Sequence, residues 1–261
     1  MGREKRIDLN CDMGEGFGIY RIGDDETLLR HVTSANIACG FHAGDPTVMR
    51  RTVRLCLEHG TAVGAHPGLP DLVGFGRRHM AIPAEEVRDL VLYQIGALHA
   101  IASAEGARLV HVKPHGALYH MANGDRAVAD AVAEAVARAS DACGHPLLLV
   151  APPEGELSGA GVRYGLSVLR EAFADRLYAP DGSLASRRTP GSVLSAEEAA
   201  DQALAIAMGE AVKASDGSHV QIAADTICVH GDSPGAARAA EAIRRKLEQA
   251  GFAVCPAISL E

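Results

Sequence analysis

The sequence contains no tryptophan, and aromatic residues make up only 4% of its 261 residues. Stacking surfaces for single-stranded nucleic acids depend on aromatic rings, so this class of partner is disfavoured. Positive charge is also scarce, because 25 Lys and Arg stand against 33 Asp and Glu and the formal net charge is -8. A phosphate-backbone partner needs a concentrated basic surface, so we do not expect a nucleic-acid-binding protein.

Long apolar runs are missing as well. No run approaches the ~20 residues that a membrane span requires. The stretch from Met1 to Arg6 lacks the apolar segment of a signal peptide. The six cysteines are scattered and no C-x-x-C pair occurs, which indicates reduced thiols rather than a disulfide framework. These absences predict a cytoplasmic protein.

Two common nucleotide-binding motifs are absent too. The chain has no G-x-x-x-x-G-K-[ST] phosphate loop, and its Gly14–Gly18 segment lacks the spacing of a dinucleotide fingerprint. If the reaction uses ATP, this chain therefore offers no familiar phosphate cradle for it.

What the sequence does contain is a repeated pattern, in which a short apolar run ends in ionisable residues beside Gly or Pro and an amphipathic stretch follows. Seven runs are β-prone: Ile7–Cys11, Ala35–Cys39, Ala62–Ala65, Leu109–Val112, Leu147–Val150, a weaker one near Ser167–Arg170, and Thr226–Val229. They are continuous rather than alternating, as expected of parallel strands covered on both faces. The order predicts a single α/β domain over residues 1–261 and favours a barrel over an open sheet, with the ionisable groups on one rim.

Polar residues alternate along the first predicted strand. Asp8, Asn10 and Asp12 share one face, which would be the inner face of a barrel. Buried carboxylates are costly unless they bind metal, share protons or are hydrogen-bonded, so this face is a functional candidate. We take Asp12 and Glu15 as candidate catalytic residues and Asn10 as a candidate substrate-binding residue. The alternative is that Asp12 or Glu15 caps a loop and that Asp8 is solvated at an edge.

Four histidines stand at matching strand ends. One such histidine is usually a structural residue, but His42, His66, His115 and His230 share the position, and a common rim explains the coincidence. His42, His115 and His230 are candidates for catalysis, and His42, His66 and His115 are candidates for holding a metal ion.

Two of these histidines have a carboxylate close by in the sequence. Asp45 lies three residues after His42, and Asp232 lies two residues after His230. Either carboxylate can orient the histidine or bind a metal ion. An Asp before Pro is also a good helix N-cap, and an Asp at a helix start interacts well with the helix dipole, so structural roles stay open for both.

Basic side chains accompany the predicted rim. Lys113 lies two residues before His115 and would face the same side, where it can contact a carboxylate or an oxyanion. An ordinary rim salt bridge is the alternative. Arg77 lies in a Gly-rich loop, and the segment from Glu171 to Arg176 follows the weak sixth strand. We take Lys113, Arg77, Glu171 and Arg176 as candidate substrate-binding residues, because arginines can clamp a carboxylate or phosphate.

Five segments resemble the LamB/YcsF family: Leu9–Gly18, Ala35–Pro46, Lys113–Tyr119, Glu171–Arg176 and Ala224–Asp232. The resemblance runs from about Ile7 to Ala253 in the family's order, and none of these blocks departs from the family's pattern. It implies a distorted seven-stranded β/α barrel, TIM-barrel-like and of the type found in glycoside hydrolases and polysaccharide deacetylases. It also implies ATP-dependent 5-oxoprolinase activity, which opens 5-oxo-L-proline to L-glutamate. The chain would be the A subunit of that enzyme and would work with partner subunits B and C.

These implications suggest a division of labour. We hypothesise that subunits B and C bind most of the ATP and phosphorylate the lactam oxygen, and that this barrel opens the ring by hydrolysis. Asp12 or Glu15 would be the general base. His42, His66 and His115 would position the water or hold a divalent ion, for which His and carboxylate sets suit Zn, Mn or no metal at all.

The remaining roles follow from the same hypothesis. His230 would protonate the leaving nitrogen, and Lys113 or an arginine would hold the substrate carboxylate.

Two alternative functions stay open at this point. The chain can be a stand-alone metal-dependent amide hydrolase or deacetylase, or a substrate-binding subunit without catalysis of its own.

Overall fold

Seven parallel strands close into a barrel at the centre of the molecule. The computed structural model describes residues 5–185, 189, 191–231 and 235–257. Each barrel strand pairs with the next, and the last pairs with the first. In order they are β1 (Arg6–Met13), β2 (Ser34–Ala38), β3 (Ala62–His66), β4 (Leu109–Val112), β5 (Leu148–Ala151), β6 (Val168–Phe173) and β9 (Thr226–Val229). The seven predicted strands and the α/β barrel are confirmed.

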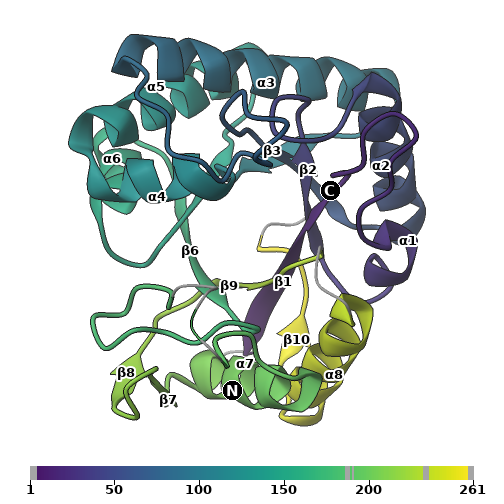
Figure 1. Cartoon of the computed structure of the whole chain (residues 1–261). Coiled ribbons are helices and arrows are strands. Elements are labelled where there is room, and N and C mark those ends of the chain that lie inside the picture. Colours follow the sequence, from purple (N-terminus) through teal and green to yellow (C-terminus); the bar gives the residue numbers. More distant parts are fainter. Residues whose placement is uncertain (1–4, 186–188, 190, 232–234, 258–261) are drawn as a thin grey trace.

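Helices form the outer layer around these strands (Figure 1). They are α1 (Asp25–Leu28), α2 (Pro46–His59), α3 (Ala84–Ala104), α4 (Gly116–Gly124), α5 (Arg126–Cys143), α6 (Glu156–Arg163), α7 (Ala196–Met208) and α8 (Ala236–Gln249). Within the described ranges, no helix combines the length and the apolar character needed to cross a bilayer.

Helix α2 shows how local sequence sets these elements. The Asp45 side chain accepts hydrogen bonds from the first-turn amides and Pro46 opens the helix, a favoured N-terminal arrangement. Val53 and Cys56 are buried on the face toward the barrel. Gly60 ends the helix in the left-handed conformation at φ 66°, which glycine adopts without strain.

The two faces of each barrel strand differ in polarity. In β1, Leu9 and Cys11 belong to the hydrophobic core between strands and helices. The alternating residues Asp8, Asn10 and Asp12 point into the barrel and make polar contacts there. Apolar packing therefore stabilises the outside of the barrel, whereas a hydrogen-bonded network fills its inside.

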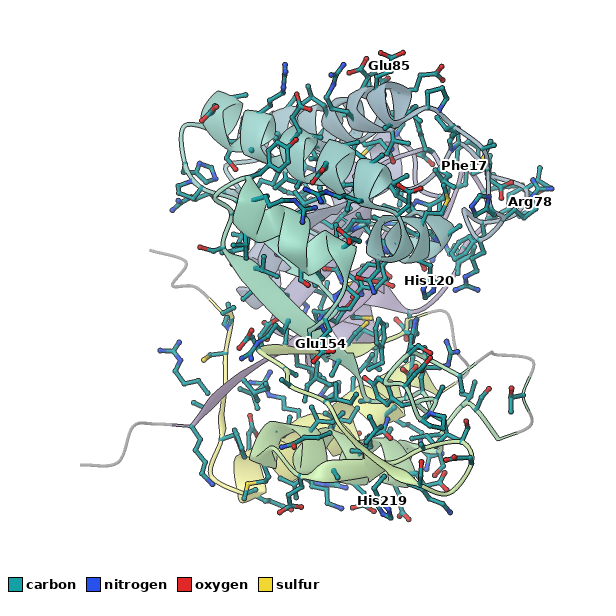
Figure 2. All side chains as sticks on the ribbon, turned by 90° about the vertical axis from the view of Figure 1, so that its left-hand side faces the viewer. Phe17, Arg78, Glu85, His120, Glu154 and His219 are labelled. Atoms are coloured by element: carbon teal, nitrogen blue, oxygen red, sulfur yellow. The ribbon has the colours of Figure 1, made fainter. Side chains whose placement is uncertain are left out.

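Three short strands lie outside the barrel. Strand β10 (Ala253–Val254) pairs in parallel with the start of β1. Strand β7 (Ala211–Lys213) pairs with β8 (His219–Gln221) as an antiparallel hairpin after α7. The carboxyl ends of the barrel strands lie on one side of the molecule. In Figure 2 the labelled residues Phe17 and Arg78, from the loops after β1 and β3, and His120, from helix α4 after β4, project on that side.

Candidate active site

Asp8 forms the floor of the barrel interior. It accepts hydrogen bonds from the hydroxyls of Thr33 and Ser34, both at 2.7 Å, and from that of Thr226. Burial raises the pKa of Asp8 above its usual value, against the opposing effect of these three donors. Asp8 is thus enclosed and bonded, and its alternative placement as a solvated edge residue is wrong.

Asn10 lies one layer above Asp8. Its amide nitrogen donates to Thr226 Oγ1 at 2.7 Å, and its Oδ1 accepts from Asn36 Nδ2 at 2.8 Å. The side chain is 1% exposed and is not among those that line the cavity at the barrel mouth. Its role in substrate binding stays a prediction, and the structure shows it as a link in the interior network.

Lys113 is buried at the centre of the barrel mouth. Its Nζ lies 2.7 Å from Glu171 Oε1, 3.0 Å from Asp12 Oδ1 and 3.1 Å from Cys228 Sγ. Burial alone would lower the pKa of Lys113, but Asp12 and Glu171 outweigh it and hold that pKa above the usual range. Likewise, burial would raise the pKa of Asp12, while His66 and Lys113 hold it well below its usual value. Asp12 is therefore an ionised carboxylate beside an ammonium group.

Three histidines and a carboxylate converge above Asp12. One donor atom from each of Glu15, His42, His66 and His115 lies within 4.8 Å of the others, and all four residues are buried. Glu15 Oε1 is 3.7 Å from His42 Nε2 and 3.7 Å from His115 Nδ1. The rings of His42 and His115 stack with centroids 3.7 Å apart. The structure therefore brings together the three histidines that the sequence singles out and adds Glu15 to them.

Backbone carbonyls fix the tautomers of two of these rings. His66 Nδ1 lies 2.7 Å from the Lys113 carbonyl, and His115 Nε2 lies 2.9 Å from the Phe75 carbonyl. A carbonyl only accepts, so each of these nitrogens carries the proton. In neutral rings, the unprotonated His66 Nε2 and His115 Nδ1 then face each other at 2.9 Å. Two opposed lone pairs at this separation need a proton or a cation between them.

His42 supplies a second sign of a cation site. The ring is 0% exposed, and neither Nδ1 nor Nε2 has a hydrogen-bond partner among the residues that the structure describes. Burial is the main cause that lowers the pKa of His42 well below its usual value, so the ring is neutral. A buried imidazole without a hydrogen bond is unfavourable unless something binds its lone pair.

Missing side chains make room for this ring. A Cβ on Gly68 would stand 2.4 Å from His42 Nδ1, and a Cβ on Gly76 would stand 2.7 Å from His42 Cβ. Gly76 also has a φ of 63°, a conformation that favours glycine. The two glycines therefore admit His42 into the cluster.

The donor set fits a divalent metal ion. Neutral imidazoles and a carboxylate are its usual protein ligands, and ligating histidines commonly donate their second ring N–H to a carbonyl, as His66 and His115 do. Glu15, His42, His66 and His115 would hold the ion. Asp12 Oδ1 lies 3.4 Å from His66 Nε2, at the edge of the same cluster.

A cavity of about 280 Å³ opens above the cluster. Its lining includes Asp12, Lys113, His115 and His230 together with Arg77 and Arg176. The Arg77 guanidinium lies 4.8 Å from the centre of the Phe75 ring, and Arg176 donates to the Ala185 carbonyl at 2.6 Å. The volume is near the lower end of ligand pockets, which suits a small molecule.

His230 stands across the cavity beside Asp175. Its Nδ1 lies 2.9 Å from Asp175 Oδ1, and its ring stacks on Phe173 at 5.4 Å between centroids. Burial would raise the pKa of Asp175, but His230 lowers it below the usual value. The Nδ1 contact leaves Nε2 as the ring nitrogen that can exchange a proton with a molecule in the cavity. Asp232 lies outside the described residues.

One other sequence candidate, Asp45, has structural partners. Asp45 caps α2 through the amides of Thr47 and Val48 and also accepts from Gly18 N at 2.8 Å. The N-cap alternative for Asp45 is therefore confirmed. Arg78, the neighbour of Arg77, forms an ion pair with Asp71.

A model of the LamB/YcsF family matches residues 7–261. The chain belongs to the LamB/YcsF family. Two curated relatives are named as the A subunit of 5-oxoprolinase. The one from Symbiobacterium thermophilum is 56% identical over 97% of this chain and 96% of its own length. The one from Bacillus subtilis is 52% identical over 95% of this chain and 96% of its own length.

Solved structures agree with this family assignment. The lactam utilization protein from Thermus thermophilus is 49% identical and superposes with a TM-score of 0.89, covering 96% of this chain and 99% of its own. A family 4 carbohydrate esterase from Streptomyces lividans superposes at a TM-score of 0.50 with 14% identity, over 98% of this chain and 94% of its own. At that identity the likeness concerns the barrel fold alone.

Three polar residues of this LamB/YcsF chain are not singled out by the sequence pattern: Asn36, His111 and Asp175. Asn36 donates to Asp12 at 2.9 Å and accepts from His111 at 2.7 Å. Each of the three interrupts or closely follows an apolar strand. A polar residue in such a run, the signal that marks Asp8 and Asn10, could have found them.

Proposed function

We propose that this chain is the A subunit of an ATP-dependent 5-oxoprolinase and opens 5-oxo-L-proline to L-glutamate. The observation that carries the proposal is the buried cluster of Glu15, His42, His66 and His115 beside an ionised Asp12, at the floor of a small cavity. Identities of 51–56% to relatives named as the A subunit of 5-oxoprolinase support the substrate.

The substrate is a small ring with one carboxylate, and the cavity offers matching charge. Arg77 and Arg176 line its wall and hold the carboxylate, because guanidinium groups bind carboxylates through paired hydrogen bonds. Lys113 contributes through its charge, since its ammonium already contacts Asp12 and Glu171. The lactam carbonyl then faces the cluster at the cavity floor.

Asp12 is the general base toward water. It is ionised, it lines the cavity, and it adjoins the cluster through His66. A divalent metal ion, when held by Glu15, His42, His66 and His115, supplies Lewis acidity next to the reacting carbonyl. Water adds to the ring carbon, its proton passes to Asp12, and the bond from that carbon to nitrogen breaks.

His230 protonates the leaving nitrogen. Asp175 holds the ring through Nδ1 at 2.9 Å, so that Nε2 carries the proton to be transferred. The basic Asp12 and the acidic His230 thus line the same cavity.

Partner subunits B and C complete the reaction in this proposal. A five-membered lactam is a stabilised amide, and phosphorylation of its oxygen by B and C at the expense of ATP prepares it for attack by water. Opening of the phosphorylated ring leaves γ-glutamyl phosphate, and a second water hydrolyses this acyl phosphate to L-glutamate and inorganic phosphate. The missing phosphate-loop motif in this chain motivates the division. We place the complex in the cytoplasm, which agrees with six unpaired cysteines.

Reconstitution with purified B and C tests this function. We expect 5-oxoproline-dependent glutamate formation only when all three proteins and ATP are present. ATP turnover by this chain alone, with no B or C, would contradict the division of labour. Failure of the complete mixture to form glutamate would contradict the proposed reaction.

A further inference from the structure

Four adjacent strands place Asp12, Asn36, Gly64 and His111 on one line across the barrel. Asp12 in β1 pairs with Asn36 in β2, Asn36 with Gly64 in β3, and Gly64 with His111 in β4. The three side chains in this line are buried. Such lines of inward residues form the packed layers of a β/α barrel, where a large residue needs a small neighbour.

Gly64 is the small residue in this line. A Cβ at this position would stand 2.0 Å from His111 Nε2 and 2.3 Å from its two neighbouring ring carbons. The imidazole of His111 therefore occupies the space that a side chain at position 64 would fill. Gly64 does not have a positive φ, so the absent side chain, rather than backbone freedom, is what the site requires.

His111 in turn orients the Asn36 amide. His111 Nε2 lies 2.7 Å from Asn36 Oδ1, which only accepts, so Nε2 carries the proton. Burial lowers the pKa of His111 to about 3, which keeps the ring neutral. With Oδ1 fixed toward His111, the Asn36 amide nitrogen faces Asn10 Oδ1 at 2.8 Å and Asp12 Oδ1 at 2.9 Å.

Three nitrogen atoms lie near the same oxygen of Asp12, Oδ1. Asn36 Nδ2, Lys113 Nζ and His66 Nε2 lie 2.9, 3.0 and 3.4 Å from Asp12 Oδ1. Asp12 also lines the cavity. Its second oxygen, Oδ2, is then the one that a water in the cavity can use.

We propose that Asn36 is the positioning residue for Asp12, held in place by His111 in the space left by Gly64. The proposal rests on the proposed function, in which Asp12 is the base. Asn36 is 0% exposed and is not among the residues that line the cavity, so it acts by fixing Oδ1, and Oδ2 then presents a constant geometry. A displacement of about 1 Å at a reacting group can lower a rate about 100-fold.

Asn36→Leu removes the amide at nearly constant volume. In the reconstituted complex we expect kcat to fall about 100-fold, with KM within about twofold of wild type, since the carboxylate-binding arginines are untouched. The matched control is Thr33→Val, which removes another buried hydrogen bond in the barrel but contacts Asp8 rather than Asp12. It should lower Tm and leave kcat unchanged. Wild-type kcat in Asn36→Leu would overturn the proposal.

A double-mutant cycle tests the steric link. His111→Ala and Gly64→Ala should each lower kcat, the first by releasing the Asn36 amide and the second by displacing the ring. The double variant has room for the new methyl group, so it should be no slower than His111→Ala alone. Additive losses in the double variant would overturn the link through Gly64.

An NMR signal from the His111 ring proton tests the contact between His111 and Asn36 independently of catalysis. In protein labelled with ¹⁵N-histidine, the His111 Nε2 proton should give a slowly exchanging NMR signal in wild type that shifts or disappears in Asn36→Leu. An unchanged signal would overturn the proposal even if glutamate formation were normal. A wild-type complex that makes no glutamate but shows the expected signal change would instead refute the proposed function and leave the positioning geometry supported.

Discussion

At the scale of single residues, burial keeps two histidines of the cluster neutral. It lowers the pKa of His115 to about 3 and that of His42 well below its usual value. Both rings are therefore neutral near pH 7, and a neutral imidazole is the form that binds a metal ion. The carbonyl contacts of His66 and His115 turn the remaining lone pairs toward each other.

Metal binding by this cluster is the first prediction at the residue scale. His42→Ala should lower the affinity for a divalent transition metal by at least about 100-fold, because even residues that only support the ligands change affinity 10–100-fold. Titration of the metal-stripped protein, with bound metal measured by mass spectrometry, checks this. His120→Ala is the control, since His120 lines the same cavity outside the cluster. Equal metal content in wild type and His42→Ala would contradict the assignment.

The ion pair of Asp175 and His230 predicts a pH dependence. The pKa of Asp175 is lowered in the folded chain, so its contribution to stability is present above the unfolded value near 3.9 and is lost as pH falls through the folded value. Asp175→Asn should lower the free energy of unfolding by about 1–3 kcal/mol at pH 7. The difference from wild type should shrink below pH 4, as followed by urea unfolding at several pH values. A difference that is constant across this range would rule out the carboxylate as its source.

Sequence reasoning at this scale found the residues that stand at strand ends. Glu15 and the three clustered histidines follow or end their strands, where a polar residue after an apolar run is conspicuous. Asn36 and His111 lie inside strands, and only the register across the barrel shows what they contact. That register is a property of several strands together and cannot be read from one of them.

At the scale of elements, glycines in the loops after the strands decide how closely the side chains can approach. Gly68 and Gly76 lie after β3, and Gly116 opens α4 at a φ of 52°. A Cβ on Gly76 would meet both His42 and His115, at 2.7 and 2.9 Å. The loop after β3 therefore allows the cluster to form, because its glycines leave room for the imidazole rings.

Two glycine substitutions should have opposite effects. Gly76→Ala should lower the free energy of unfolding by at least about 1 kcal/mol and weaken metal binding, because its φ is left-handed and its Cβ would collide with two rings. Gly96→Ala, within α3 and with open space around its Cβ, should raise stability by about 0.5–1 kcal/mol. Chemical unfolding of both variants measures the two changes in the free energy of unfolding. Equal effects would show that the crowding at Gly76 is not real.

Element prediction from the sequence was most successful where apolar periodicity was long. Ser195 and Glu198 form a capping box at the start of α7, and Gly60 ends α2, so both helix boundaries coincide with local sequence signals. Helices α4 and α6 were not predicted, because they have nine and eight residues and contain internal or terminal glycines that weaken the helical pattern. The β7–β8 hairpin has strands of three residues, too short for an alternation to be recognised.

At the scale of the whole molecule, barrel closure is what makes a site from distant residues. Asp12 in β1 and Cys228 in β9 are 216 positions apart, yet both lie within about 3 Å of Lys113 Nζ. The pairing of β1 with β9 brings this about. The sequence favoured a barrel by its repeated strand and helix order, but closure depends on strand tilt and register, which no single repeat contains.

We further propose that residues 1–261 fold as one domain. The chain should then unfold in a single cooperative transition, with coincident midpoints by far-UV circular dichroism and by tyrosine fluorescence, which is usable because tryptophan is absent. Two separated transitions would indicate two independently folding parts.

The central claim is that the cluster and Asp12 perform chemistry on a lactam. The most direct measurement is 5-oxoproline-dependent glutamate formation by the complex of B and C with Asp12→Asn, at saturating ATP. Loss of a general base lowers turnover about 100- to 10,000-fold, so we predict at least a 100-fold loss while light scattering shows intact assembly. Unchanged turnover with intact assembly would contradict the claim and reduce this chain to a scaffold.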